Sequence, residues 1–146
     1  MQFSIGAGGA LTDTGAIATT GSHYDAVNIV LNQSGAKVYA YVLSNAVGVD
    51  TNTGALWQYG VESSGELAAA NPPMLNIGPV ALAQVVQVDL LYVLTTNSGA
   101  SANTASTGGN INFYSLGADG VATLTATTKI SAPSPVSMGM LFLLAP

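Results

Sequence analysis

A short pattern recurs three times along this chain at almost constant intervals. Each copy has an aromatic residue, an apolar or small residue two positions later, and then a turn that contains glycine. The copies are Phe3-Ser4-Ile5 before Gly9, Tyr59-Gly60-Val61 before Gly65, and Tyr114-Ser115-Leu116 before Gly120. The aromatic residues are 56 and 55 positions apart (59 − 3 and 114 − 59), and the glycines keep the same steps. Such a period predicts a repeat architecture with several short strands in each unit.

A second apolar strand recurs between these copies. Its three occurrences are Tyr39–Leu43, Leu91–Leu94 and Leu141–Leu144. Together the two patterns divide one all-β domain, residues 1–146, into units of roughly 1–55, 56–110 and 111–146. Three units are too few to close a propeller ring, which has four to eight blades as a rule. The repeat therefore raises the question of a partner.

Strand patterns dominate the whole chain. No stretch carries the apolar spacing of an amphipathic helix, and Gly, Ser and Thr clusters interrupt the sequence at short intervals. The expected strands are Gln2–Gly6, Ala16–Thr20, Val27–Asn32, Lys37–Ser44, Leu56–Val61, Met74–Ile77, Val80–Val86, Asp89–Thr95, Ile111–Leu116, Ala122–Thr128, Val136–Met140 and Leu141–Leu144. Pro72-Pro73 and Pro79 are expected where the chain crosses from one sheet to the next.

The composition is poor in charge. Charged residues make up 6% of the chain, whereas about a quarter is usual. With two lysines, no arginine and a net charge of −5, the chain has no basic surface for nucleic acid or anionic membranes. Charges normally protect strand edges from unwanted pairing, so their scarcity favours a surface covered by copies of the same chain.

Targeting and redox signals are also scarce. The absence of cysteine excludes disulfides and thiol chemistry. The N-terminus lacks the basic and apolar regions of a signal peptide. The longest apolar run, Met138–Pro146, is too short to span a bilayer, so no membrane span is expected.

These strand motifs resemble the YVTN/lactonase-like β-propeller repeats. The matching segments are Tyr41-Val42-Leu43-Ser44-Asn45, Tyr92–Asn97, Gln58–Val61 with Gly65 and Leu67, and Phe113–Gly120. The resemblance implies four-stranded antiparallel blades. The Pro-led inner strand of the family is clear only at Gly78-Pro79 and Ser134-Pro135, and the third unit is shortened.

The phase of the repeat has a consequence for assembly. On the family pattern, the chain opens with the two outer strands of a blade and closes with two inner strands. Two complete blades and two complementary halves result, so the terminal strands of one copy are expected to pair with those of the next. The residues expected in this intersubunit pairing are Gln2, Phe3, Ser4, Ile5, Leu141, Phe142, Leu143 and Leu144. The same phase fits a fragment of one longer propeller.

Few residue groups offer chemistry. His23 with Asp25 is the one His–carboxylate cluster, and a loop is the better interpretation. Asp50-x-Asn52-x-Gly54 has the alternation of a calcium loop, but Val61 stands where such a loop needs a glutamate. Glu62 and Glu66 flank a hairpin turn and are expected to be solvated. We therefore expect no catalytic residue, no cofactor and no metal.

Aromatic residues offer one candidate contact. Most of them occupy repeat-equivalent strand positions, which favours packing between blades. Trp57 is expected to point to the face of its strand opposite Tyr59, and it is the aromatic we consider for ligand or subunit contact.

The favoured function is a non-enzymatic structural protein, extracellular or on the cell surface, that self-assembles into a ring, filament or tube. A multivalent carbohydrate-binding propeller is the alternative, with glycans held by the Asn45–Gly54 and Asn97–Asn110 loops on one face. A sugar-lactone hydrolase is a weaker alternative, because such an activity needs a polar cluster, and nine charged residues and one histidine give this chain little to build one from.

Overall fold

The chain forms β-strands throughout the part that the structure describes. The structure is a computed structural model, and it describes residues 3–13, 15, 23–47, 53–78, 81–96 and 108–131. Within these ranges there are ten strands and no helix. The strands are β1 (Phe3–Ile5), β2 (Leu11–Asp13), β3 (Tyr24–Ser34), β4 (Lys37–Ala46), β5 (Gly54–Val61), β6 (Leu67–Gly78), β7 (Ala81–Gln87), β8 (Leu90–Thr96), β9 (Gly108–Leu116) and β10 (Ala122–Ser131).

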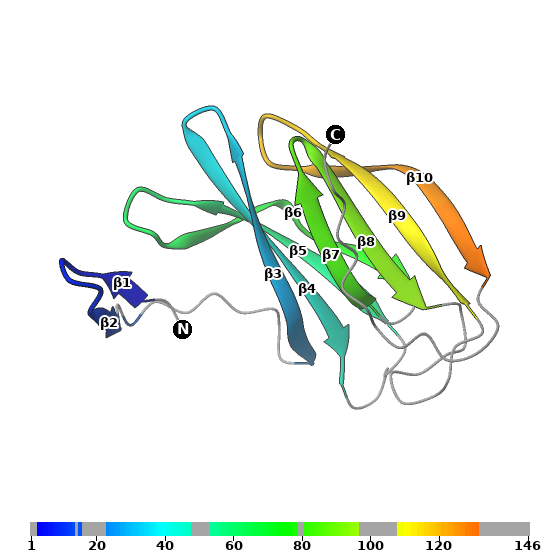
Figure 1. The fold of residues 1–146 in the computed structure, drawn as a ribbon, viewed down its shortest axis with the longest axis horizontal. Helices are drawn as coiled ribbons and strands as arrows, with labels where there is room; N and C mark the ends of the chain where they lie inside the picture. The colour runs from blue at the N-terminus through cyan, green and yellow to red at the C-terminus, as the bar shows by residue number, and fades with distance from the viewer. Residues whose placement is uncertain are drawn as a thin grey trace.

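The strands form two large antiparallel sheets and one small one (Figure 1). Strands β3-β4-β5-β6 make the first four-stranded sheet in chain order, and β7 to β10 make the second in the same way. Strands β1 and β2 pair only with each other and lie apart from both large sheets. Short turns connect β3 to β4, β5 to β6, β7 to β8 and β9 to β10, so each of these pairs is an antiparallel hairpin, and longer segments link β4 to β5 and β8 to β9.

The expected all-β class is confirmed, and so are the four-stranded antiparallel sheets. The expected strands that fall within the described residues are all present, although β3, β6, β9 and β10 are longer than the sequence indicated, and β2 was not expected. The expected strands at 16–20, 136–140 and 141–144 lie outside the described residues.

The expectation for Pro72-Pro73 is wrong, because both prolines lie inside β6. Strand β6 is an edge strand, and its register against β5 shifts between Trp57 and Tyr59. A residue without an N–H is tolerated at such an edge irregularity. The first sheet ends at Gly78 and the second begins at Ala81, so the link between them falls at residues 79–80.

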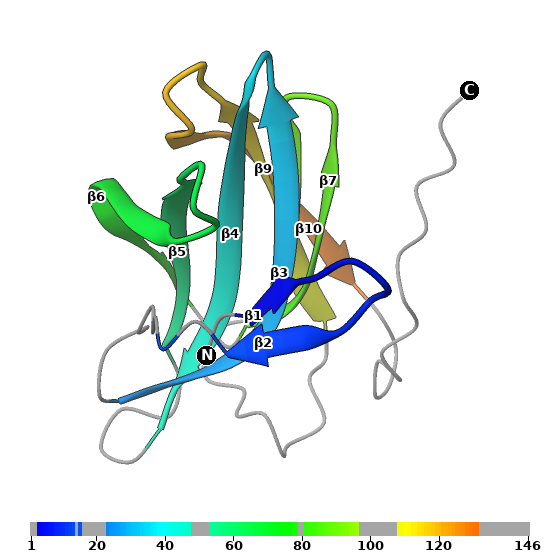
Figure 2. The same cartoon turned by 90° about the vertical axis from the view of Figure 1, so that its left-hand side faces the viewer.

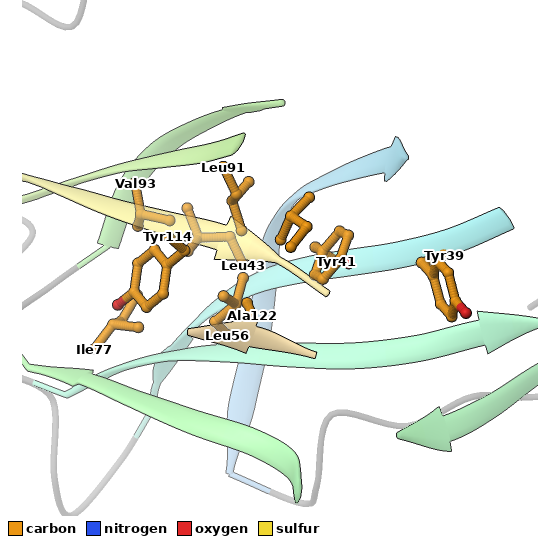
Figure 3. Close-up of a cluster of buried hydrophobic side chains, with 10 residues drawn as sticks. Tyr39, Tyr41, Leu43, Leu56, Ile77, Leu91, Val93, Tyr114 and Ala122 are labelled. Carbon is orange, nitrogen blue, oxygen red and sulfur yellow. The ribbon is translucent and has the colours of Figure 1, made fainter. Parts of the chain in front are cut away.

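The main core lies between the two large sheets (Figure 3). Tyr41, Leu43 and Leu56 from the first sheet are fully buried, as are Leu91 and Val93 from the second. The other buried members of this cluster are Tyr39, Ile77, Tyr114, Leu116 and Ala122. This burial of apolar surface supplies most of the driving force for stacking the sheets.

Candidate interaction surface

The two large sheets meet through faces that are not equivalent. Along β4, alternate residues Tyr39, Tyr41 and Leu43 face the second sheet, as strand alternation requires. Tyr41 lies opposite Gln58 on β5, and Tyr92 lies opposite Phe113 on β9. Phe113 is the repeat counterpart of Gln58, because it is 55 positions further along the chain (113 − 58). Tyr92 is therefore the counterpart of Tyr41. In the second sheet, however, it is Leu91 and Val93 that face the core.

This arrangement is a head-to-tail stack. The first sheet uses the face that carries Tyr41. The second sheet uses the face that carries Leu91 and Val93, which is opposite the face that carries Tyr92, the counterpart of Tyr41. The contact leaves the Tyr92 face of the second sheet uncovered by the first sheet, and it leaves the face of the first sheet opposite Tyr41 uncovered by the second. These two faces are of different kinds, so a further sheet can pack on either in the same head-to-tail manner. The pattern differs from a two-fold sandwich, in which both sheets would present the same residues.

Hydrogen bonds fix the stack where the β9–β10 turn meets the first sheet. The Tyr39 hydroxyl donates to the Ala118 carbonyl oxygen at 2.7 Å, and the Tyr41 hydroxyl donates to that of Gly120 at 2.8 Å. Two core tyrosines thus hold the backbone of a turn that lies 79 residues away in the sequence. Since both hydroxyls find acceptors, their burial is not penalised.

Two buried glutamines add further bonds between the sheets. Gln58 accepts a hydrogen bond from the Ala122 amide of the second sheet at 2.6 Å, and it donates within the first sheet to the Pro72 carbonyl oxygen at 2.9 Å. Gln84 reaches across from β7 and donates to the carbonyl oxygens of Tyr41 at 2.8 Å and Asn28 at 3.2 Å. Polar side chains therefore set the register of an otherwise apolar interface.

Burial alters the acidity of the core tyrosines. Burial raises the pKa of Tyr41 to about 12, with smaller contributions from the negative charges that Tyr39, Asp119 and Asp89 can carry. Burial also raises the pKa of Tyr114 to about 12 and that of Tyr59 above its usual value. Removing a phenol from water disfavours its anion, so these hydroxyls stay protonated as hydrogen-bond donors.

The three glycine turns predicted from the repeat share their closing hydrogen bond and one left-handed glycine. In each, an amide donates to the carbonyl oxygen four residues later, at 2.8 to 3.0 Å: Gly6 to Ala10, Glu62 to Glu66, and Gly117 to Val121. The turn glycine follows with a left-handed φ of 81° at Gly9, 86° at Gly65 and 79° at Gly120, a conformation that costs other residues stability. The first turn differs from the other two in one residue, because Gly8 is also left-handed, with a φ of 89°, whereas Ser64 and Asp119 at the same position are not.

The surroundings of the three turns differ. A Cβ atom added to Gly120 would overlap the ring of Tyr39, whereas one added to Gly9 or Gly65 meets nothing within 4 Å. The β9–β10 turn therefore packs into a site on the first sheet that is formed by Tyr39, Tyr41 and Gln58, and we call this site the seat of the turn. Within the described part of the chain, the other two turns have no such seat.

The residues expected to pair with a second copy are only partly described. Phe3, Ser4 and Ile5 form β1, which pairs with β2 in the register Phe3 to Asp13. Gln2, Leu141, Phe142, Leu143 and Leu144 lie outside the described residues. Intersubunit pairing through these residues stays a prediction.

The expectation for the direction of Trp57 is wrong. Trp57 and Tyr59 are two residues apart on β5 and share one face, where both pack with Ala40 and Val42. The indole Nε1 donates to the Ser44 Oγ at 2.8 Å, and its ring meets Tyr24 edge-on at a centroid distance of 5.6 Å. Residues two positions apart on a strand point to the same face, so Trp57 cannot face away from Tyr59. Contact between Trp57 and a ligand or subunit stays a prediction.

The remaining chemical candidates have structural roles where they are described. The backbone carbonyl of His23 accepts a hydrogen bond from the Val47 amide, and Asp25 is exposed at the start of β3. Glu62 and Glu66 are exposed and close the β5–β6 turn through their backbones. Asp50 and Asn52 lie outside the described residues, as does most of the Asn97–Asn110 loop.

Among the residues with described positions, no group of three or more His, Asp or Glu side chains lies close enough together to hold a metal ion. The same residues form no helix of the length and apolar character needed to cross a bilayer.

Comparison with known proteins yields no relative. No family model matches the chain, and neither the curated proteins nor the solved structures contain a match.

Proposed function

We propose that this chain is a non-enzymatic structural protein of propeller type that assembles with copies of itself through its terminal strands. The observation that carries the proposal is the β1–β2 hairpin. It shares its closing hydrogen bond and its left-handed turn glycine with β5–β6 and β9–β10, each of which forms the last two strands of a four-stranded sheet. The β1–β2 hairpin has no inner pair of strands within the described residues.

The missing inner pair would come from residues 136–144 of a second copy. If residues 141–144 take the place of β4, the register between β4 and β5 carries over by repeat position. Phe3 would then lie opposite Leu141 and Gln2 opposite Phe142, as Tyr59 lies opposite Ala40 and Gln58 opposite Tyr41. Main-chain hydrogen bonds would provide affinity, and apolar side chains would provide fit.

The composition supports the same proposal. With 6% charged residues, the chain has few charges to keep an open strand edge from pairing. A head-to-tail contact between copies gives a ring if the rotation closes and a filament or tube if it does not. An extracellular or cell-surface location and the resemblance to YVTN/lactonase-like repeats belong to this proposal as well.

Proline substitutions on the two strands of the hairpin test the proposal. Gly6 donates to Ala10, so these two residues form a hydrogen-bonded pair and the next pair, Ile5 and Leu11, is a non-hydrogen-bonded one. The Ile5 N–H is therefore directed away from β2, toward the proposed partner strand. Ile5→Pro removes that donor while leaving the β1–β2 bonds intact.

The matched control is Leu11→Pro on β2, the strand equivalent to the outer edge strand β6. Ile5 and Leu11 are 75% and 66% exposed, so neither substitution disturbs the core. We expect Ile5→Pro to raise the concentration needed for assembly by about tenfold and Leu11→Pro to change it little. Equal effects of the two substitutions, measured by light scattering, would contradict pairing through β1.

A further inference from the structure

The seat of the β9–β10 turn has a counterpart on the second sheet. The register between strands places Tyr39 opposite Gly60 and Leu90 opposite Ser115, and Ser115 is 55 residues beyond Gly60. Leu90 and Tyr92 are thus the counterparts of Tyr39 and Tyr41, the two residues that hold the turn. This repeated position is what identifies a second seat.

The counterpart residues lie on the side of the second sheet that faces away from the first. We call this side the outer face and define it by Leu90, Tyr92, Leu94, Ile111 and Phe113. Leu90 is 43% exposed and the other four side chains are half-buried. Tyr92 and Phe113 meet edge-on with a centroid distance of 5.3 Å, which gives the face a fixed aromatic centre.

We propose that the outer face binds the Gly6–Ala10 turn of a second copy of this chain. The contact would repeat the one inside the molecule, with Gly9 in the place of Gly120 and Tyr92 in the place of Tyr41. The Tyr92 hydroxyl would donate to the Gly9 carbonyl oxygen, as the Tyr41 hydroxyl donates to that of Gly120. The inference rests on the proposed self-association, and it names the surface that receives the partner.

Three observations support this occupant. The Gly6–Ala10 turn has the hydrogen bonds and the left-handed turn glycine of the turn that is seated, and it differs from that turn in a second left-handed residue, Gly8. The Glu62–Glu66 turn has the same hydrogen bonds, but it carries two carboxylates that an apolar face would desolvate. Gly9 has room for a neighbour, since nothing lies within 4 Å of an added Cβ. Figure 1 shows the β1–β2 hairpin on one side of β3 and the second sheet on the other, and Figure 2 shows the hairpin in front of β3, so a second copy is the natural source of the turn for this face.

The two seats differ in one chemically informative way. Gln58, which accepts the Ala122 amide in the seat within the chain, is replaced by Phe113 at the equivalent position of the outer face. The outer face is therefore more apolar than its counterpart. Binding there draws on apolar burial and on one hydroxyl rather than on a buried amide.

Site-directed crosslinking tests the contact, because the chain contains no cysteine. In the seat within the chain, Tyr39 lies against Ala118, whose repeat counterpart is Ala7. An Ala7→Cys chain is mixed with a tagged Leu90→Cys chain and treated with a short bifunctional maleimide. The control mixture replaces the second chain by tagged Leu124→Cys, whose leucine is more exposed, at 53%, and lies on β10 away from the outer face.

The expected result is a mixed Ala7–Leu90 product that exceeds the Ala7–Leu124 product severalfold, measured on denaturing gels. If light scattering shows assembly but the two mixtures give equal yields of crosslinked product, the inference is overturned while self-association remains supported. A dominant Ala7–Ala7 product would also overturn it, because that product needs a symmetric contact. Monomers that give no crosslink would remove both this inference and the proposed function.

Discussion

Gly120 and the ring of Tyr39 share one space between the sheets, which leaves no room for a side chain at position 120. We expect Gly120→Ala to lower the free energy of unfolding by about 2–4 kcal/mol, because the left-handed φ and the overlap both cost stability. Gly65→Ala is the matched control, with a similar φ of 86° and nothing within 4 Å of the added Cβ. It should cost only about 1–2 kcal/mol. Equal losses in urea unfolding would show that the Tyr39 contact adds nothing.

The buried tyrosines predict a loss of stability in alkali. The folded pKa of Tyr41 and Tyr114 is about 12, above the usual value of about 10. Between about pH 10 and pH 12 the unfolded chain has lost phenol protons that the folded chain retains. The free energy of unfolding therefore falls as pH rises through this window, and the contribution of the two tyrosines is fully present below about pH 10. Tyr41→Phe should make the fall shallower in denaturant unfolding followed against pH. Titration of the Tyr41 and Tyr114 phenols near pH 10 in the folded protein would contradict this account.

At the scale of the elements, β7 is held to the first sheet by Gln84. Its amide donates to carbonyl oxygens on both β3 and β4, although its own Oε1 has no partner among the described residues. We expect Gln84→Leu to destabilise the protein by about 1–3 kcal/mol, because two carbonyl oxygens lose a donor. Gln33→Leu makes the same change on exposed β3, where the amide bonds only to Gly35, and should stay within about 0.5 kcal/mol. Thermal unfolding of both variants checks the difference.

The elements also show what the sequence can and cannot predict. The repeat spacing located the turns at Gly9, Gly65 and Gly120, because a left-handed residue in a tight turn leaves a glycine in the sequence. Strand lengths were less predictable, since β6 continues through Pro72-Pro73 at an edge irregularity.

The seat for the turn was not predicted. It depends on Tyr39, Tyr41 and Gln58, whose counterparts in the second sheet are Leu90, Tyr92 and Phe113. A repeat keeps the backbone register while the side chains at each interface change. Which face of a sheet meets its neighbour, and which polar groups bridge them, became visible only with both sheets in place.

At the scale of the whole molecule, the two large sheets form one step of a stack. The second sheet leaves outward its Tyr92 face, the counterpart of the Tyr41 face that the first sheet already uses. The same packing can therefore continue into a second copy of the chain. The proposed assembly would rest on main-chain hydrogen bonds and apolar contacts, which salt screens little. With seven acidic and two basic residues, the chain offers few charges to hold an assembly together.

The most direct test of self-assembly is the molar mass of the unaltered chain by light scattering, measured against concentration at low and high salt and paired with negative-stain electron microscopy. The account predicts masses well above the 14.6 kDa of one copy, persisting at high salt, with rings, filaments or tubes in the images. A mass of 14.6 kDa at every concentration would contradict self-assembly and would assign the missing strands to a longer chain.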